Sequence, residues 1–77
     1  MTAREFSDRF KPFVPVRRVA TDAGFREATF YMAVTRGRDL TADEVSRLRA
    51  AVEAHAETLR RMAGELEAAP DAAPTNE

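Results

Sequence analysis

A long segment without a helix breaker constrains this chain more than any other feature of its sequence. From Thr41 to Leu66 there is no proline, and alanine, glutamate, arginine and leucine, which all have strong helix preferences, dominate the segment. Thr41-Ala42-Asp43-Glu44 fits a capping box, in which the threonine hydroxyl and the glutamate carboxylate satisfy free N–H groups at a helix start. The pattern predicts a helix of about 25 residues.

Apolar residues in this predicted helix recur at alternating steps of three and four, with one histidine in the series. The spacing is typical of a heptad seam, although Ala51, Ala56 and Ala63 allow the wider stripe of an ordinary core-facing helix. We expect the first half of the stripe, Val45, Leu48 and Val52, to pack on the rest of the domain. The second half extends beyond such a small core and is expected to form a homodimer interface of His55, Leu59, Met62 and Leu66.

The chain has no cysteine, which excludes disulfides and thiolate zinc sites and fits a reducing compartment. A single core in 77 residues contributes only a few kcal/mol of stability, so oligomerisation is the remaining way to reinforce it. No run approaches the roughly 18 apolar residues of a membrane span, and the first residues lack the apolar stretch of a signal peptide. We expect a soluble, cytoplasmic protein.

Two shorter helices are predicted near the N-terminus. Thr2 and Glu5 form another capping box, and the helix that follows must end before Pro12, because the residue preceding a proline is driven out of helical geometry. Pro15 fits the first position of the next helix, where its missing N–H costs nothing. This second helix is expected over residues 15–23.

A third short helix is expected over about 26–36. Gly24 is placed to cap the preceding helix in the left-handed conformation, and Gly37 to end this one. Residues 1–67 are therefore expected to form one small all-α domain of four helices. Residues 68–77 contain nothing large to bury and are expected to form a disordered tail.

The formal net charge of −1 conceals a strong polarity along the chain. Residues 1–38 carry eight basic and four acidic groups, a balance of +4, whereas residues 39–77 carry four basic and nine acidic groups, a balance of −5. A basic half joined to an acidic half is one pattern by which a small protein binds DNA with one end and another partner, often itself, with the other.

Residues 16–35 resemble the helix-turn-helix of the phage repressor and Cro family of DNA-binding proteins. Two helices cross closely in that motif, so its fifth position must be small and its ninth must adopt a positive φ. Ala20 and Gly24 occupy these positions when Val16 is counted as the first. The motif's five apolar positions are occupied by Val19, Ala23, Phe25, Phe30 and Ala33.

The resemblance implies a repressor-like transcriptional regulator that binds double-stranded DNA as a homodimer on a palindromic operator. The helix over 26–36 would enter the major groove, with Glu27 as an acceptor for a cytosine amino group. The residues nearest the base edges would be Glu27, Ala28, Tyr31, Met32 and Thr35. Basic residues that flank this helix would bind phosphates: Arg17, Arg18, Arg26, Arg36 and Arg38.

Two alternatives remain open at this point. The turn is also compatible with an ordinary helical bundle, and the aromatic and methionine pair Tyr31 and Met32 suits a protein-binding patch, as in an adaptor or antirepressor. His55 is the only histidine and has no partner for a metal or catalytic site. The sequence also contains no glycine-rich phosphate loop and no nucleophile elbow, and the long helix is acidic where a membrane-surface helix would be basic. We expect no enzyme, no metal, no cofactor, no small-molecule substrate and no membrane partner.

Overall fold

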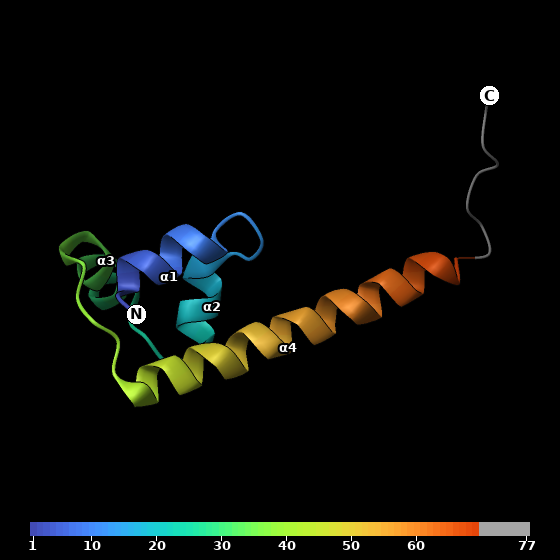
Figure 1. Ribbon diagram of the computed structural model, residues 1–77. Coiled ribbons are helices and arrows are strands. Elements are labelled where there is room, and N and C mark those ends of the chain that lie inside the picture. Colours follow the sequence, from blue (N-terminus) through green and yellow to red (C-terminus); the bar gives the residue numbers. More distant parts are fainter. Residues whose placement is uncertain (70–77) are drawn as a thin grey trace, which may run out of the picture.

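The computed structural model describes residues 1–69, which form four α-helices and no β-sheet. α1 (Ala3–Phe10), α2 (Val16–Asp22) and α3 (Glu27–Arg36) gather around the first half of α4 (Ala42–Glu67), and the second half of α4 projects away from them (Figure 1). The predicted all-α, four-helix domain is confirmed. Of the expected tail, residues 70–77 lie outside the described part of the chain.

Both predicted capping boxes are present. At the start of α1, the Thr2 hydroxyl accepts from the Glu5 N–H at 3.0 Å, and the Glu5 carboxylate accepts from the Thr2 N–H at 3.3 Å. At the start of α4, the Thr41 hydroxyl accepts from the Glu44 N–H at 3.1 Å, and the Glu44 carboxylate accepts from the Thr41 N–H at 2.9 Å. Each pair satisfies N–H groups that the first helical turn leaves free.

The second helix is shorter than predicted by one residue at each end. Pro15 was expected at the first helical position, but its φ of −74° and ψ of 91° make it the extended residue that precedes α2. At the other end Ala23 caps the helix, and Gly24 follows with a φ of +93°. Gly37 ends α3 with a φ of +64°. Both glycines therefore adopt the left-handed geometry expected of them.

The core lies where α1, α2, α3 and the first half of α4 meet. Its aromatic centre is Phe30, whose ring lies 6.3 Å from that of Phe6 and 5.3 Å from that of Phe25 in edge-to-face arrangements. Leu48 brings α4 into this core and is only 2% exposed. The buried cluster consists of Phe6, Val19, Ala20, Ala23, Phe25, Phe30 and Leu48.

The α4 stripe meets this core less completely than expected. Leu48 is buried and Val52 is half-buried, but Val45 is 42% exposed. The expectation that Val45 packs on the domain is therefore largely wrong, because Val45 lines an open groove between α4 and α1. No helix within residues 1–69 combines the length and apolarity needed to cross a bilayer.

The first residues of the chain are tied to the loop between α3 and α4. The Ala3 N–H donates to the Arg38 carbonyl oxygen at 2.8 Å, and the Leu40 N–H donates to the Met1 carbonyl oxygen at 2.9 Å, which forms a single antiparallel bridge between Thr2 and Asp39. This pairing fixes the entry to α1 against the exit from α3.

Candidate nucleic-acid interface

The turn between α2 and α3 sets the position of the candidate DNA-facing helix. Ala20 is 2% exposed at the crossing, and its carbonyl oxygen accepts from the Phe25 N–H at 3.0 Å across the turn. Gly24 takes the positive φ that such a tight connection requires. The seven residues that carry the helix-turn-helix resemblance thus include six buried side chains around one left-handed glycine.

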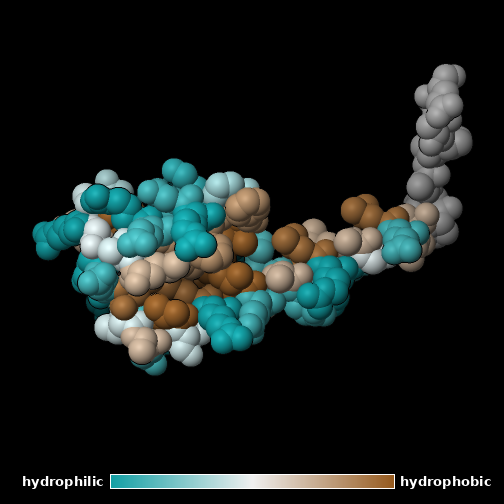
Figure 2. Space-filling model, in the orientation of Figure 1, coloured by the Kyte–Doolittle hydropathy of each residue, from teal (hydrophilic) through white to brown (hydrophobic). Residues whose placement is uncertain are grey.

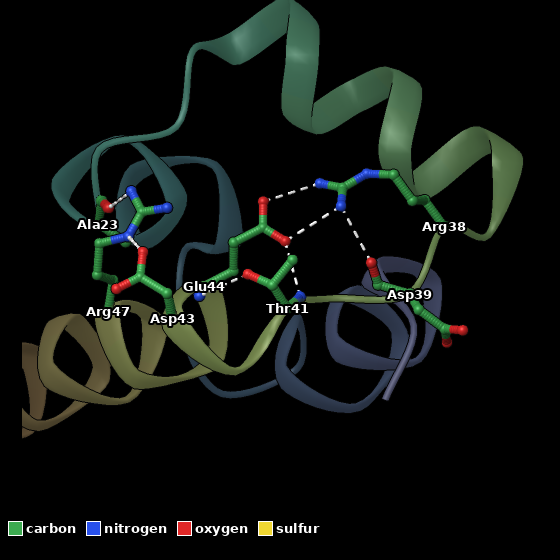
Figure 3. Close-up of polar contacts among 7 residues, drawn as sticks. All are labelled: Ala23, Arg38, Asp39, Thr41, Asp43, Glu44 and Arg47. Carbon is green, nitrogen blue, oxygen red and sulfur yellow. Dashed lines mark hydrogen bonds and ion pairs between the residues drawn. The ribbon is translucent and has the colours of Figure 1, made fainter.

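An arginine on α4 holds this turn from outside. The Arg47 Nη1 donates to the Ala23 carbonyl oxygen at 2.9 Å, and its guanidinium carbon lies 5.3 Å from the centre of the Phe25 ring (Figure 3 shows the hydrogen bond). The same guanidinium is oriented by Asp43, whose Oδ2 accepts from Nε at 2.9 Å. The contact satisfies a carbonyl that the end of α2 would otherwise leave free, so α4 fixes the position of α3.

A second arginine caps α3 at its C-terminus. The Arg4 Nε on α1 donates to the Val34 carbonyl oxygen at 3.2 Å, and another guanidinium nitrogen donates to the Thr35 carbonyl oxygen. A cation at this end of a helix complements its dipole and its free carbonyls. Both ends of α3 are therefore anchored, one through the turn and one through α1.

The predicted base-reading residues share the outer surface of α3. All five are exposed, with 68% of Tyr31 and 42% of Met32 accessible, while Phe30 and Ala33 face the core. The helix therefore presents an aromatic ring, a thioether, a methyl group, a hydroxyl and one carboxylate on the surface that sequence reasoning selected. The residues on it are Glu27, Ala28, Tyr31, Met32 and Thr35.

Glu27, the one acid on this surface, is paired with Arg17. The two side chains form an ion pair that joins the first turn of α2 to the first turn of α3. Both side chains remain mostly exposed, so the pair contributes little to stability. The ion pair instead changes the charge of this surface, because the Arg17 guanidinium offsets the Glu27 carboxylate. Arg17, which was expected to bind a phosphate, is bound to Glu27 in this structure. Sequence reasoning missed the pair because the two residues lie on different helices.

Arg38 is likewise occupied. Its two terminal nitrogens donate to the two oxygens of Glu44 at 3.1 and 2.9 Å, and Nη1 also donates to the Asp39 carbonyl oxygen at 3.0 Å (Figure 3). These hydrogen bonds from Arg38, together with that from the Thr41 N–H, lower the pKa of the Glu44 carboxyl to about 2. Arg38 therefore holds the start of α4 in place, a structural role that its sequence position did not indicate.

The three other predicted phosphate-binding residues make no side-chain hydrogen bond or ion pair within residues 1–69. They are Arg18 on α2, Arg26 immediately before α3 and Arg36 in its last turn. All three are exposed. Arg26 and Arg36 thus lie at the two ends of α3, and Arg18 is exposed on α2.

An open apolar groove of about 1120 Å³ runs between α2, α3 and the loop before α2. Val14 and Val16 line one side of it, and Tyr31 and Met32 line the other, with Lys11, Arg17 and Glu27 as its charged members. Sequence reasoning missed this groove, because periodicity shows which face of each helix is apolar but not the gap between two packed helices.

The predicted dimer residues lie along the projecting half of α4. His55 is half-buried, whereas Leu59, Met62 and Leu66 are 46%, 53% and 79% exposed. In residues 1–69 no group of three or more histidine, aspartate or glutamate side chains is placed to hold a metal ion.

No protein-family model, curated protein or solved structure was found to match this chain.

Proposed function

We propose that this protein is a DNA-binding transcriptional regulator, repressor-like in type, that acts as a homodimer on a palindromic operator. In this proposal α3 enters the major groove and the free arginines beside it bind phosphates. The protein carries out no catalysis and needs no cofactor. It binds DNA by electrostatic attraction and selects its site through the exposed side chains of α3.

One observation carries the proposal. An exposed helix is held at both ends, by Arg47 through the turn and by Arg4 at the C-terminus, and free guanidinium groups border it. A helix fixed in this way meets DNA without first being ordered, and the arginines supply the charge that attracts phosphates. If α3 had only a structural role, it would not need unpaired arginines around its exposed surface.

The side chains on the outer surface of α3 suit contacts with base edges in the DNA major groove that are mostly apolar. Ala28 and Met32 can contact thymine methyl groups, and the Thr35 hydroxyl can bond either a base edge or a phosphate. Glu27 can accept from a cytosine amino group once Arg17 has moved to a phosphate. We infer that the ion pair opens on DNA binding and that Glu27 then selects for cytosine.

A titration of the protein against random-sequence duplex DNA tests the proposal. Fluorescence anisotropy of labelled DNA is expected to show binding that weakens steeply between roughly 50 and 200 mM salt, because bound arginines displace counterions from phosphates. Absence of binding at the lower salt concentration would contradict the proposal.

The apolar groove beside α3 favours a second candidate function. A partner protein could insert an apolar side chain between Val16 and Tyr31, which would make the chain an adaptor or antirepressor rather than a DNA-binding protein. The same titration separates the two functions, because the adaptor predicts no duplex binding at low salt.

A further inference from the structure

A second apolar groove, of about 360 Å³, lies on the side of α4 that faces α1. Met1, Phe6 and Phe10 line its α1 side, and Val45 and Val52 line its α4 side. Figure 2 shows apolar side chains gathered between α1 and the first half of α4. Arg49 and Glu53 stand on the rim of this α1–α4 groove. It shares no lining residue with the groove beside α3.

The projecting half of α4 carries the only other large apolar surface of that helix within residues 1–69. Leu59, Met62 and Leu66 are each about half or more exposed, and they continue the same heptad series as Val45 and Val52. Figure 2 shows this apolar surface on the side of the projecting helix that also bears the groove. The groove and the exposed stripe are therefore two parts of one helix face.

The two parts have matching lengths. Val45 and Val52 are seven residues apart, as are Leu59 and Leu66, so each pair spans about 10 Å of helix. A two-fold axis near Ala56 would place Leu66 of each copy beside Val45 of the other, and Leu59 beside Val52. In such an arrangement, the same surface of each copy contacts the other copy, and each copy fills the α1–α4 groove of its partner. A closed two-fold dimer requires an interface of this kind.

The positions of the groove and the stripe select the direction of the second helix. The groove lies beside the first half of α4, and the exposed stripe lies on its second half. An antiparallel copy brings the stripe of each chain to the groove of the other. A parallel copy leaves the groove unfilled, because the projecting halves would then lie beside each other. The axis falls between His55 and Ala56, and the small side chain of Ala56 permits close approach there.

We propose that two copies of the chain dimerise through antiparallel α4 helices, and that the Leu59–Leu66 stripe of each copy occupies the α1–α4 groove of the other. The proposal rests on the homodimer of the proposed function and is independent of DNA binding. In the dimer each domain gains the apolar contacts that its own small core lacks.

Disulfide crosslinking tests the arrangement cleanly, because the natural chain has no cysteine. Ala56→Cys alone is expected to form a dimer of doubled mass on a non-reducing gel, since residue 56 of each copy lies next to the axis. Leu66→Cys alone is expected to stay monomeric on that gel, whereas an equimolar mixture of Val45→Cys and Leu66→Cys chains is expected to crosslink. Self-crosslinking of Leu66→Cys without Ala56→Cys would show a parallel pair and overturn the proposal.

Sedimentation of charged variants provides a second test that does not depend on disulfide geometry. Val45→Asp and Leu66→Asp are each expected to halve the measured mass, and both positions are exposed enough for the monomer to remain folded by circular dichroism. Phe13→Asp is the matched control, because Phe13 is also exposed but lines neither groove and lies outside the stripe. A dimer unaffected by Val45→Asp would overturn the proposal, and a wild-type monomer would remove the homodimer itself. Neither result would alter the response of DNA binding to the arginines beside α3.

Discussion

The Arg47 guanidinium on α4 donates a 2.9 Å hydrogen bond to the Ala23 carbonyl oxygen at the end of α2, 24 residues earlier in the chain. The contact connects the long helix to the turn that positions α3. It is only part-buried, but it replaces water at a carbonyl that has no helical partner. Through this one side chain, the helix proposed to dimerise also supports the helix proposed to bind DNA.

Removal of this donor is expected to destabilise the domain. Arg47→Met retains the apolar stem but removes the hydrogen bond and the cation above the Phe25 ring, so the free energy of unfolding should fall by about 1 to 2 kcal/mol. Urea unfolding at fixed protein concentration measures this change in the free energy of unfolding. Asp43→Asn is the control, because it removes the ion pair with Arg47 and leaves the Ala23 hydrogen bond in place. An equal decrease in both variants would assign the effect to the ion pair.

A methyl group at Gly24 is expected to disturb both the turn and Arg47. The φ of +93° is unfavourable for alanine, and the added Cβ would lie 2.9 Å from the Arg47 Nη1. Gly24→Ala should therefore lower the free energy of unfolding by about 1 to 2 kcal/mol.

Gly64→Ala provides the matched comparison, since Gly64 lies inside α4 with nothing within 4 Å of an added Cβ. Alanine there should raise α4 stability by up to about 1 kcal/mol. Thermal unfolding followed by circular dichroism measures both variants. A neutral Gly24→Ala would argue against a tightly constrained turn.

The Glu44 carboxyl predicts an acid-sensitive start to α4. Its pKa is held at about 2 in the folded chain, against an ordinary value of 4.5, by Arg38 and then by the Thr41 N–H. Because the folded pKa is the lower one, the stabilisation is complete above about pH 4.5 and disappears as the pH falls towards 2. Glu44→Gln should cost about 1 kcal/mol at pH 7 and nothing near pH 2.

Urea unfolding of both proteins across this range checks the prediction. Glu53→Gln serves as the control, because the exposed Glu53–Arg49 pair should contribute no more than a few tenths of a kcal/mol at any pH. A Glu44→Gln deficit that is unchanged at pH 2 would show that the carboxyl charge is not what stabilises the loop.

Neutralisation of Glu27 is expected to strengthen non-specific DNA binding. Glu27→Gln removes a negative charge from the proposed interface and releases Arg17, so affinity for random duplex should rise by roughly threefold to tenfold. Glu57→Gln, on the projecting half of α4, makes the same charge change outside the interface and should have no effect. Anisotropy titrations of both variants make the comparison. Unchanged affinity for Glu27→Gln would place Glu27 outside the DNA interface.

Local signals in the sequence account for the helix boundaries and much of the core. Each capping box lies within four consecutive residues, and each glycine turn is recognisable from one residue between two apolar patterns. The buried set around Ala20, Gly24 and Phe30 followed from the spacing of the motif. Pro15 was predicted as the first residue of its helix but is the residue before it. Proline is compatible with both positions, so the sequence alone does not distinguish them.

Long-range contacts could not be predicted in the same way. Arg4, Arg17 and Arg47 each contact a different helix, 10 to 31 residues away along the chain, and all three resemble ordinary exposed arginines in the sequence. The exposure of Val45 also depends on how far α1 extends over α4, which periodicity does not specify. For the same reason, the sequence could not show that two of the five arginines assigned to phosphates, Arg17 and Arg38, are bound to glutamates on helices that come later in the chain.

The dependence of DNA binding on Arg18 and Arg26 tests the central claim most directly. Anisotropy titrations with random duplex, across roughly 50 to 200 mM salt, should show that Arg18→Ala with Arg26→Ala weakens binding to all sequences alike and flattens the salt slope by roughly one for each arginine that no longer neutralises a phosphate. Arg9→Ala with Arg61→Ala removes the same charge from α1 and the projecting part of α4 and should change neither quantity appreciably. An equal weakening in the two double variants, or none in the first, would contradict the assignment of α3 and its flanking arginines to DNA.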